Sequence, residues 1–401
     1  MARSDRLTIF VSDPGSLLTN YRPHGDGLTA WGFVSRLVAR GHTVHVAASA
    51  VDLSQAPPPR LIIHPYAISD SLLLPFPLQA MLRIRHIFRR LRRDVQFDLI
   101  HQLNPVRQGL TSLLIRERVP IVLGPYVPRW APSQSPRAKP PLLSAALQRV
   151  PQLVARRLAI AQERRAAALL LTTPAAREVL HAAEAHAHKT AFLPCGVDTR
   201  AFTPGVDAGP SEGGHSPSIL FLANLHARKG IHTLLDAFEQ VSERIPNCGL
   251  RIAGAGPESE NVRGRIAAMR CGRNISMLGA VQRPNVPAVL RSGTVYCLPS
   301  YGEPFCVSAI EAMACGKPLV VTDALGLAYL IDDPEGGRKV PPRDAVALAE
   351  ALIQLLSTPD LCHSMGIYNR QKAVQNYDWD VVIDRLEGIY RKVLSTQSPT
   401  H

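Results

Sequence analysis

The chain has 401 residues, enough for two domains of ordinary size that each bury a hydrophobic core. With 46% hydrophobic and 19% charged residues it has the composition of a globular protein, which excludes a disordered or fibrous chain. No apolar run reaches the length of a membrane-spanning helix, and the LTIFV stretch shortly before Asp13 is expected to be a first strand and not a signal peptide.

The seven cysteines are odd in number and show no CxxC spacing. We therefore expect reduced, mostly buried thiols in a cytoplasmic protein, and no metal site. They are Cys195, Cys248, Cys271, Cys297, Cys306, Cys315 and Cys362.

The net charge of +13 is unevenly distributed. Residues 1–200 carry 26 Lys and Arg against 12 Asp and Glu, whereas the rest of the chain is close to neutral. This asymmetry indicates a negatively charged partner or surface for the first half. A nucleic acid is one such partner, but no basic platform interleaved with aromatic residues and no helix-turn-helix pattern supports it.

The first half begins with the βαβ rhythm of a doubly wound sheet. A strand at 7–11 and a second at 43–48 flank a predicted helix at 28–40. The residues before this helix, Gly25, Asp26 and Gly27, are predicted to form a glycine loop at the carboxyl end of the first strand, where such sheets bind ligands. A plain tight turn is the alternative, because the pattern is not a GxGxxG fingerprint.

Residues 78–94 predict a basic amphipathic helix. Its apolar side carries Leu78, Met81, Leu82, Ile84, Phe88 and Leu91, and its arginines are Arg83, Arg85, Arg89, Arg90, Arg92 and Arg93. Two interpretations remain open: a helix that lies on an anionic membrane, or one packed on the sheet with solvated arginines.

Further strands are expected at 120–126 and 169–174, and the segment 190–204 is expected to close the first domain. The segment FDLIH places His101 just past another strand, where a lone histidine is usually a structural polar residue. The proline-rich stretch 127–141 is long for a loop inside a domain, and we interpret it as a lid with a functional or mobile role. A linker is predicted at 210–217.

The second half repeats the βαβ rhythm. A strand at 218–224 leads to Arg228 and Lys229 and then to a helix at 231–241, so two cations stand where a strand-to-helix turn can bind a diphosphate. A strand with a glycine loop (Gly254, Gly256) follows at 250–260, and residues 274–290 add a strand and a helix. Helices are also expected at 344–356 and 377–393.

Residues 295–322 predict a strand, a polar turn with Glu303, a helix with Glu311, a Gly-Lys-Pro break and a strand. Eight positions separate the two acids, slightly more than two helical turns, so both carboxylates can face the same way. A cap and a solvated surface acid are the alternative readings. The helix is apolar nearly all round, however, and a buried acid needs a partner, for which a ligand is one candidate.

The pattern EPFCVSAIEAMACGKP, with its Glu-(seven residues)-Glu spacing, resembles the signature of retaining GT-B glycosyltransferases of family 4. RGHTVHV, FDLIH and LPCGVD extend this resemblance over most of the chain, with Cys195 where asparagine is commoner. The resemblance implies two doubly wound Rossmann-like domains that face a central cleft. Residues 1–200 with the C-terminal helix 380–401 would form the acceptor-side domain, and residues 201–379 the donor domain.

The resemblance also implies a role for each site residue. Arg228 and Lys229 would contact the leaving diphosphate, and Glu303 and His101 the transferred sugar. Glu311 would bind the ribose hydroxyls. The remaining donor-site residues would be Phe305, Cys306 and Val307 at the diphosphate, Leu278 and Gly279 at the nucleobase and the loop glycines Gly254 and Gly256, while Gly25, Asp26 and Gly27 would face the diphosphate and acceptor. Cys306 departs from the family, which has glycine there.

The sequence therefore predicts a metal-independent retaining glycosyltransferase without a cofactor. Its donor would be a UDP- or GDP-sugar, and its acceptor a hydroxyl of a glycan, a lipid-linked molecule or a small molecule. We expect a cytoplasmic protein, associated peripherally with the inner membrane face if the basic helix docks there. A non-catalytic GT-B subunit that binds a nucleotide or a partner enzyme is the alternative, mildly favoured by Cys306.

Overall fold

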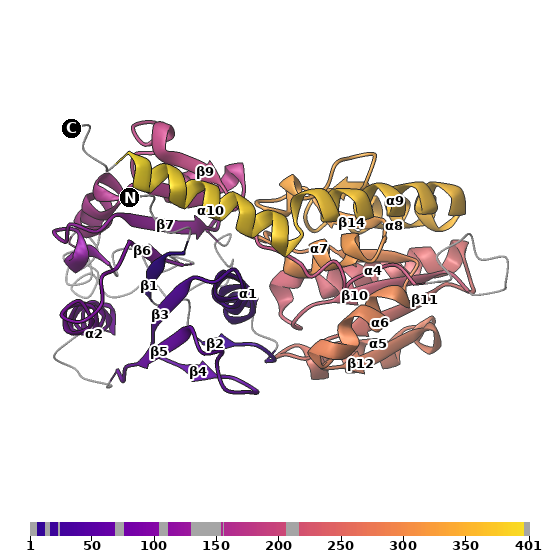
Figure 1. Cartoon of the computed structure of the whole chain (residues 1–401). Coiled ribbons are helices and arrows are strands. Elements are labelled where there is room, and N and C mark those ends of the chain that lie inside the picture. The colour runs from indigo at the N-terminus through magenta and orange to yellow at the C-terminus, as the bar shows by residue number, and fades with distance from the viewer. Residues whose placement is uncertain are drawn as a thin grey trace, which may run out of the picture. The chain divides into compact units, whose positions relative to one another are not determined.

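The computed structural model describes residues 6–12, 17–22, 25–68, 76–103, 111–129, 154, 156–205 and 216–396 (Figure 1). The chain is an α/β protein that divides into two compact units. Among the described residues, the first unit contains those up to Val127, those from 154 to Cys195 and those from Val382 onward. The second contains Pro128, Arg129 and Gly196–Val381. Most of the predicted lid, from residue 130 on, lies outside the described residues.

The first unit is built on a parallel sheet of seven strands in the order β5-β3-β1-β6-β7-β8-β9 (Figure 1). The strands are β1 (Thr8–Ser12), β3 (Thr43–Ala48), β5 (Leu61–Pro65), β6 (Leu99–Gln102), β7 (Ile121–Tyr126), β8 (Ala168–Leu171) and β9 (Thr190–Phe192). The short strands β2 (Leu18–Thr19) and β4 (Val51–Asp52) pair separately and were not predicted. The strand order reverses between β1 and β6, which is the switch point of this sheet.

Helix α1 (Gly25–Ala39) begins earlier than the sequence suggested. Gly25, Asp26 and Gly27 form its first turn, so the predicted glycine loop at these positions is wrong. The first N–H groups of a helix have no intrahelical partner, and an acid such as Asp26 is favourable beside them, which offsets the poor helix propensity of glycine.

Helix α2 (Phe76–Leu91) packs onto the core of the first unit, as one of the two interpretations of the basic segment predicted. Met81, Ile84 and Phe88 are buried, and the Phe88 ring meets Phe10 and Phe97 with centroids 5.1 and 5.4 Å apart. Leu78 and Leu82 remain 38% and 43% exposed. The apolar side predicted from sequence is therefore split between the core and the surface.

The last helix, α10 (Trp379–Ser395), starts in the second unit and continues in the first. Its part in the first unit contacts the short connection between α1 and β3. Arg40 Nη1 lies 2.7 Å from Asp384 Oδ1, and His42 Nε2 lies 3.0 Å from Glu387 Oε1. Tyr390 is fully buried in the same unit.

The second unit has a six-stranded parallel sheet in the order β12-β11-β10-β13-β14-β15 (Figure 1). The strands are β10 (Ser218–Leu222), β11 (Gly249–Ala253), β12 (Ile275–Gly279), β13 (Val295–Leu298), β14 (Leu319–Thr322) and β15 (Gly337–Val340). The helices are α4 (Ile231–Arg244), α5 (Ser259–Ala268), α6 (Val286–Arg291), α7 (Val307–Ala314), α8 (Ala345–Leu356) and α9 (Pro359–Asn376). The order reverses between β10 and β13.

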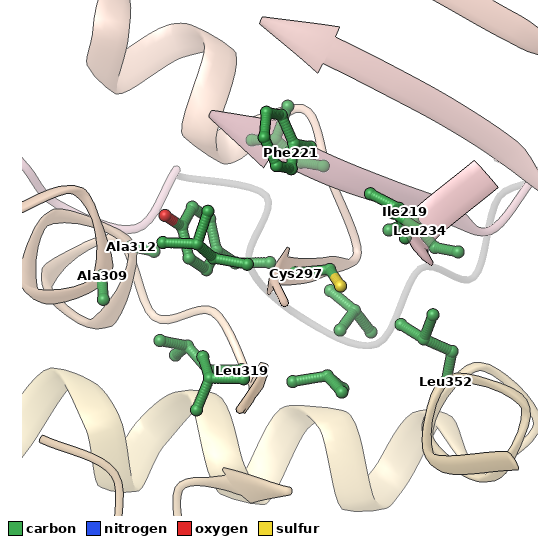
Figure 2. Packing of buried hydrophobic residues seen from close by; sticks show 14 of the residues in the cluster. Ile219, Phe221, Leu234, Cys297, Ala309, Ala312, Leu319 and Leu352 are labelled. Atoms are coloured by element: carbon green, nitrogen blue, oxygen red, sulfur yellow. The ribbon is translucent and has the colours of Figure 1, made fainter. Parts of the chain in front are cut away.

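Helices cover the sheet of the second unit and close its core. Figure 2 shows Leu234 of α4 and Leu352 of α8 gathered with Ile219, Cys297 and Leu319 of the strands, and these side chains are fully buried. Such burial on both faces explains why the strands read as continuous apolar runs in the sequence. Within the described residues, no single helix is long and apolar enough to cross a membrane; only α8 and α9 taken together, bent by 97°, meet that criterion of length and composition.

Candidate active site

Three of the residues predicted for the diphosphate and the sugar, Arg228, Lys229 and Glu303, lie at the switch point of the second unit. β10 and β13 are neighbours there, with Ile219 opposite Val295. The carboxyl end of β10 leads to Arg228 and Lys229, and that of β13 leads to Glu303. Because ligands of doubly wound sheets bind outside the carboxyl ends of the strands at such a point, the fold itself brings these three residues to a binding position.

Lys229 and Glu303 form a buried ion pair between these two loops. Lys229 Nζ donates to Glu303 Oε2, and the Glu303 residue is only 4% exposed. Ser300 Oγ donates to the Arg228 carbonyl at 3.1 Å and lies 3.4 Å from Glu303 Oε2. The Tyr301 N–H donates to the same Arg228 carbonyl at 2.9 Å. The two loops are thus fixed to each other by backbone and side-chain bonds.

Two glycines allow the turn that carries Glu303 to be approached closely from both sides. Gly230 has φ +74°, and a Cβ there would lie 1.9 Å from the Pro299 carbonyl oxygen. A Cβ on Gly326 would lie 1.6 Å from the Pro304 carbonyl oxygen. Any side chain at either position would displace the turn and with it the Glu303 carboxylate.

Burial raises the pKa of Glu303 above its usual value, and the neighbouring Lys229 and Arg228 oppose this shift. The ionised carboxylate therefore depends on its cations, because a buried charge without a partner costs several kcal/mol. A hydroxyl that joins Lys229 at this carboxylate would donate a further hydrogen bond to the charged oxygens.

Glu311 has a partner that the sequence analysis did not identify. Arg283 Nη1 lies 2.5 Å from Glu311 Oε1, and the Arg283 guanidinium stacks over the Phe202 ring at 4.8 Å. Burial raises the pKa of Glu311, and Arg283 opposes the shift. Arg283 lies in the 3₁₀ turn Arg283–Asn285 just past β12, so a cation soon after a strand was the available signal.

Cys306 fits the site without strain, although the family pattern has glycine there. Its φ of −113° is an ordinary extended conformation for any L-residue, and its side chain is buried 3.4 Å from Ser308 Oγ and 3.9 Å from Tyr296 Oη. Burial raises the pKa of the thiol to about 11, so it is not a nucleophile at neutral pH. α7 begins at Val307, and its first N–H groups have no intrahelical acceptor.

The glycines that the resemblance places in the donor site have structural reasons to be glycine. A Cβ on Gly254, which has φ +138°, would lie 1.9 Å from the Ala223 carbonyl oxygen, and one on Gly256 would lie 2.3 Å from Asn224 Oδ1. Gly279 needs glycine for its φ of +68°. Its neighbour Leu278, at the carboxyl end of β12, has an exposed side chain.

His101 lies within β6 and not just past it, so that detail of the sequence prediction is wrong. It is fully buried, its Nε2–H donates to the Gly124 carbonyl at 2.8 Å, and Nδ1 accepts from the Tyr390 hydroxyl at 2.5 Å. Burial lowers its pKa to about 4, so the ring is neutral. Both nitrogens are engaged inside the first unit, where Gly25, Asp26 and Gly27 also lie; the other predicted site residues belong to the second unit.

Two family models together match most of the chain. Residues 25–201 match "Glycosyltransferase Family 4", and residues 210–372 match "Glycosyl transferases group 1". The phosphatidyl-myo-inositol mannosyltransferase of Mycobacterium leprae is 28% identical over 371 residues, which are 90% of this chain and 91% of that protein.

Solved structures with the same fold also match over nearly the full length. Sucrose-phosphate synthase from Thermosynechococcus elongatus superposes with a TM-score of 0.72 at 20% identity, covering 98% of this chain and 100% of that one. HepE of Anabaena in complex with UDP gives 0.71 at 17% identity, covering 97% and 100%. Together with the switch-point geometry, these matches show that the chain is a glycosyltransferase of the GT-B fold, whose first half matches the Glycosyltransferase Family 4 model and whose second half matches the Glycosyl transferases group 1 model.

Proposed function

We propose that the enzyme is a retaining glycosyltransferase that moves a sugar from a UDP- or GDP-sugar to a hydroxyl of a glycan, lipid-linked or small-molecule acceptor. The observation that carries the proposal is the buried Lys229–Glu303 pair at the switch point of the second unit. A cation for the leaving phosphate and an acceptor for sugar hydroxyls stand there in direct contact. At its reacting end a nucleotide sugar carries a phosphate and sugar hydroxyls side by side, which are the groups that this cation and this acceptor can bind.

The chemistry needs positive charge where the anomeric C–O bond breaks. Cleavage leaves negative charge on the β-phosphate, which Lys229 and Arg228 neutralise together with the N–H groups at the start of α7. These groups supply the charge without a metal, and no cofactor is required. The anomeric configuration is retained because the acceptor attacks on the face of the sugar from which the phosphate leaves, without a nucleophile from the enzyme.

Substrate choice is supported by the relatives. The anionic UDP held in the HepE structure matches a donor site with two cations, and the lipid in the name of the mannosyltransferase supports a lipid-linked acceptor. Glu303 would bind hydroxyls of the transferred sugar and Glu311 those of the ribose.

A donor panel tests the proposal. UDP-, GDP- and ADP-sugars are added to the protein in a thermal-shift experiment, and we expect a UDP- or GDP-sugar to raise the Tm, since a ligand of the folded state stabilises it. With the donor that binds, a nucleotide-release assay with mixed lipids and sugars as acceptors should give turnover. Binding without release would indicate a non-catalytic GT-B subunit, and no shift with any donor would contradict the donor site.

We further propose that the enzyme works on the cytoplasmic face of a membrane and docks through α2. The exposed side of this helix combines Leu78 and Leu82, one turn apart, with Arg83 and Arg90. Exposed leucines beside arginines suit the interface of an anionic leaflet, where each basic residue contributes about 1 kcal/mol. Arg89 and Arg92 serve the fold instead, because both pair with the buried Glu117.

Vesicle co-sedimentation tests this docking. Replacing Arg83, Arg90 and Arg93 by Gln spares the Glu117 pairs and should weaken binding to phosphatidylglycerol vesicles by about 100-fold, since about 3 kcal/mol of attraction is removed. The matched control replaces Arg263, Arg270 and Arg273, exposed residues of the second unit, by Gln. Equal loss in both variants, or equal pelleting of wild type on neutral and anionic vesicles, would contradict a specific role of α2.

A further inference from the structure

The Arg283–Glu311 pair carries an inference about how the donor is held. We infer that Arg283 is a positioning residue, which orients the Glu311 carboxylate so that its second oxygen accepts the two ribose hydroxyls of the nucleotide. The inference rests on the proposed function, because it takes Glu311 to be the ribose ligand. It assigns to Arg283 a part that the family pattern and the sequence did not indicate.

The geometry leaves one oxygen of Glu311 for a ligand. Arg283 Nη1 binds Oε1, and within the described part of the chain it is the single side-chain partner of this carboxylate. Oε2 has no side-chain partner among the described residues, and the Glu311 side chain is 3% exposed. A carboxylate with one oxygen fixed by a cation is oriented before the ligand arrives, and its other oxygen keeps its capacity to accept hydrogen bonds.

The guanidinium is itself held from a second side. It lies over the ring of Phe202, with 4.8 Å between its carbon and the ring centroid, and Phe202 is buried in the core of the second unit. A cation over an aromatic face is attracted by the ring electrons, and more strongly when it is desolvated. Arg283 is therefore fixed between an aromatic face and a carboxylate, which leaves Glu311 little freedom to turn.

The charge of Arg283 matters as much as its position. Glu311 is buried among apolar residues of α7, and burial disfavours its ionised form. An ionised carboxylate accepts hydrogen bonds at both oxygens and binds hydroxyls more strongly than a protonated acid does. By opposing protonation, Arg283 keeps Glu311 in the form that accepts from a cis-diol.

The test compares nucleotides that differ only in the ribose. The dissociation constants of UDP and GDP are measured first, and the one that binds is compared with its 2′-deoxy and 3′-deoxy analogues by calorimetry. In wild type we expect the deoxy analogues to bind about 10–100-fold more weakly, the range for hydrogen bonds to a charged group. In Arg283→Met, which keeps an apolar stem against Phe202 but removes the charge, this ratio should fall below about 3-fold.

Three comparisons separate positioning from a merely structural role. Arg283→Lys, which keeps the charge, should retain part of the discrimination against the deoxy analogues. Arg263→Met, which removes an exposed charge from the same unit, should leave the ratio of dissociation constants unchanged. In both proteins the ratio should rise with pH as Glu311 loses its proton, and in Arg283→Met this rise should lie at higher pH than in wild type, because the arginine no longer opposes protonation. Using the ratio cancels the titration of the diphosphate, which is the same in both nucleotides.

The possible failures are distinct. An unchanged ratio in Arg283→Met, even with a lower Tm, would overturn the positioning role while leaving the donor site intact. An unchanged ratio in Glu311→Gln would instead overturn the ribose contact and with it that part of the proposed function. The double variant Arg283→Met/Glu311→Gln should show the ratio of Glu311→Gln alone, because the arginine acts through the carboxylate.

Discussion

Replacing Lys229 by Ala is expected to lower kcat/KM by about 100-fold or more. Removal of one preorganised donor from a site where negative charge develops costs about 2.7–4 kcal/mol in other enzymes, and Lys229 is the cation that contacts the buried Glu303 at the switch point. A steady-state assay with the donor identified by the thermal-shift panel measures this loss. Arg270→Ala, which removes an exposed charge of the same unit, serves as the control and should keep full activity.

The loss has two possible origins, because Lys229 also holds Glu303. Without the lysine, the buried carboxylate loses the cation that contacts it directly, and Lys229→Ala should lower the Tm as well. Adding Glu303→Gln removes the buried charge and should restore the Tm without restoring turnover. Recovery of turnover in the double variant, or wild-type turnover in Lys229→Ala, would contradict a direct role of Lys229 at the phosphate.

The sheets were predictable because parallel strands are buried on both faces and read as apolar runs. The second strand was predicted at 43–48 and is found at Thr43–Ala48. Helix α9 (Pro359–Asn376) was missed because exposed apolar residues, Ile367 and Val374, and a buried polar one, Asn369, obscure the helical spacing of its buried face. That face packs Cys362, Met365 and Ala373 into the core and brings the backbone close at Gly366, where a Cβ would lie 2.3 Å from the Gly316 carbonyl oxygen.

The site was predictable where one local motif positions a residue and not where tertiary packing pairs two distant ones. Glu303, Arg228 and Lys229 follow strands that the sequence located, so their convergence at the switch point could be expected. The Arg283 partner of Glu311 stands 28 positions away, and the pairing depends on how the loop after β12 meets α7. No periodicity in either segment encodes that meeting.

His101 shows that a correctly predicted strand does not reveal where a side chain on it points. The FDLIH segment identified a strand, but the sequence pattern is the same whether the histidine ring at its end points to a ligand or into the core. The bonds to Gly124 and Tyr390 that settle its surroundings come from β7 and from a helix 289 positions later. A contact of His101 with the transferred sugar therefore stays a prediction, and one that requires at least one ring nitrogen to leave its present partner.

Replacing Glu303 by Gln is expected to lower kcat by about 10–100-fold while leaving the affinity for the free nucleoside diphosphate nearly unchanged. Glutamine keeps the shape of the side chain but removes a charged acceptor, and hydrogen bonds to charged groups contribute about 1.5–3 kcal/mol. Because the proposed contact is to the transferred sugar, its loss should appear in turnover. Glu311→Gln should do the reverse, with weaker nucleotide binding measured by calorimetry and a smaller effect on kcat.

The pH profile gives the same assignment an independent readout. Burial raises the pKa of Glu303 above its usual value, so the ionised form is present at high pH and is lost as the pH falls through that raised pKa. Wild-type kcat should therefore decline on the acid side, and Glu303→Gln, which cannot titrate, should lack this decline. An acid limb that persists unchanged in Glu303→Gln would assign it to another group. Equal losses of nucleotide affinity in the Glu303 and Glu311 variants would contradict the division of sugar and ribose between the two acids.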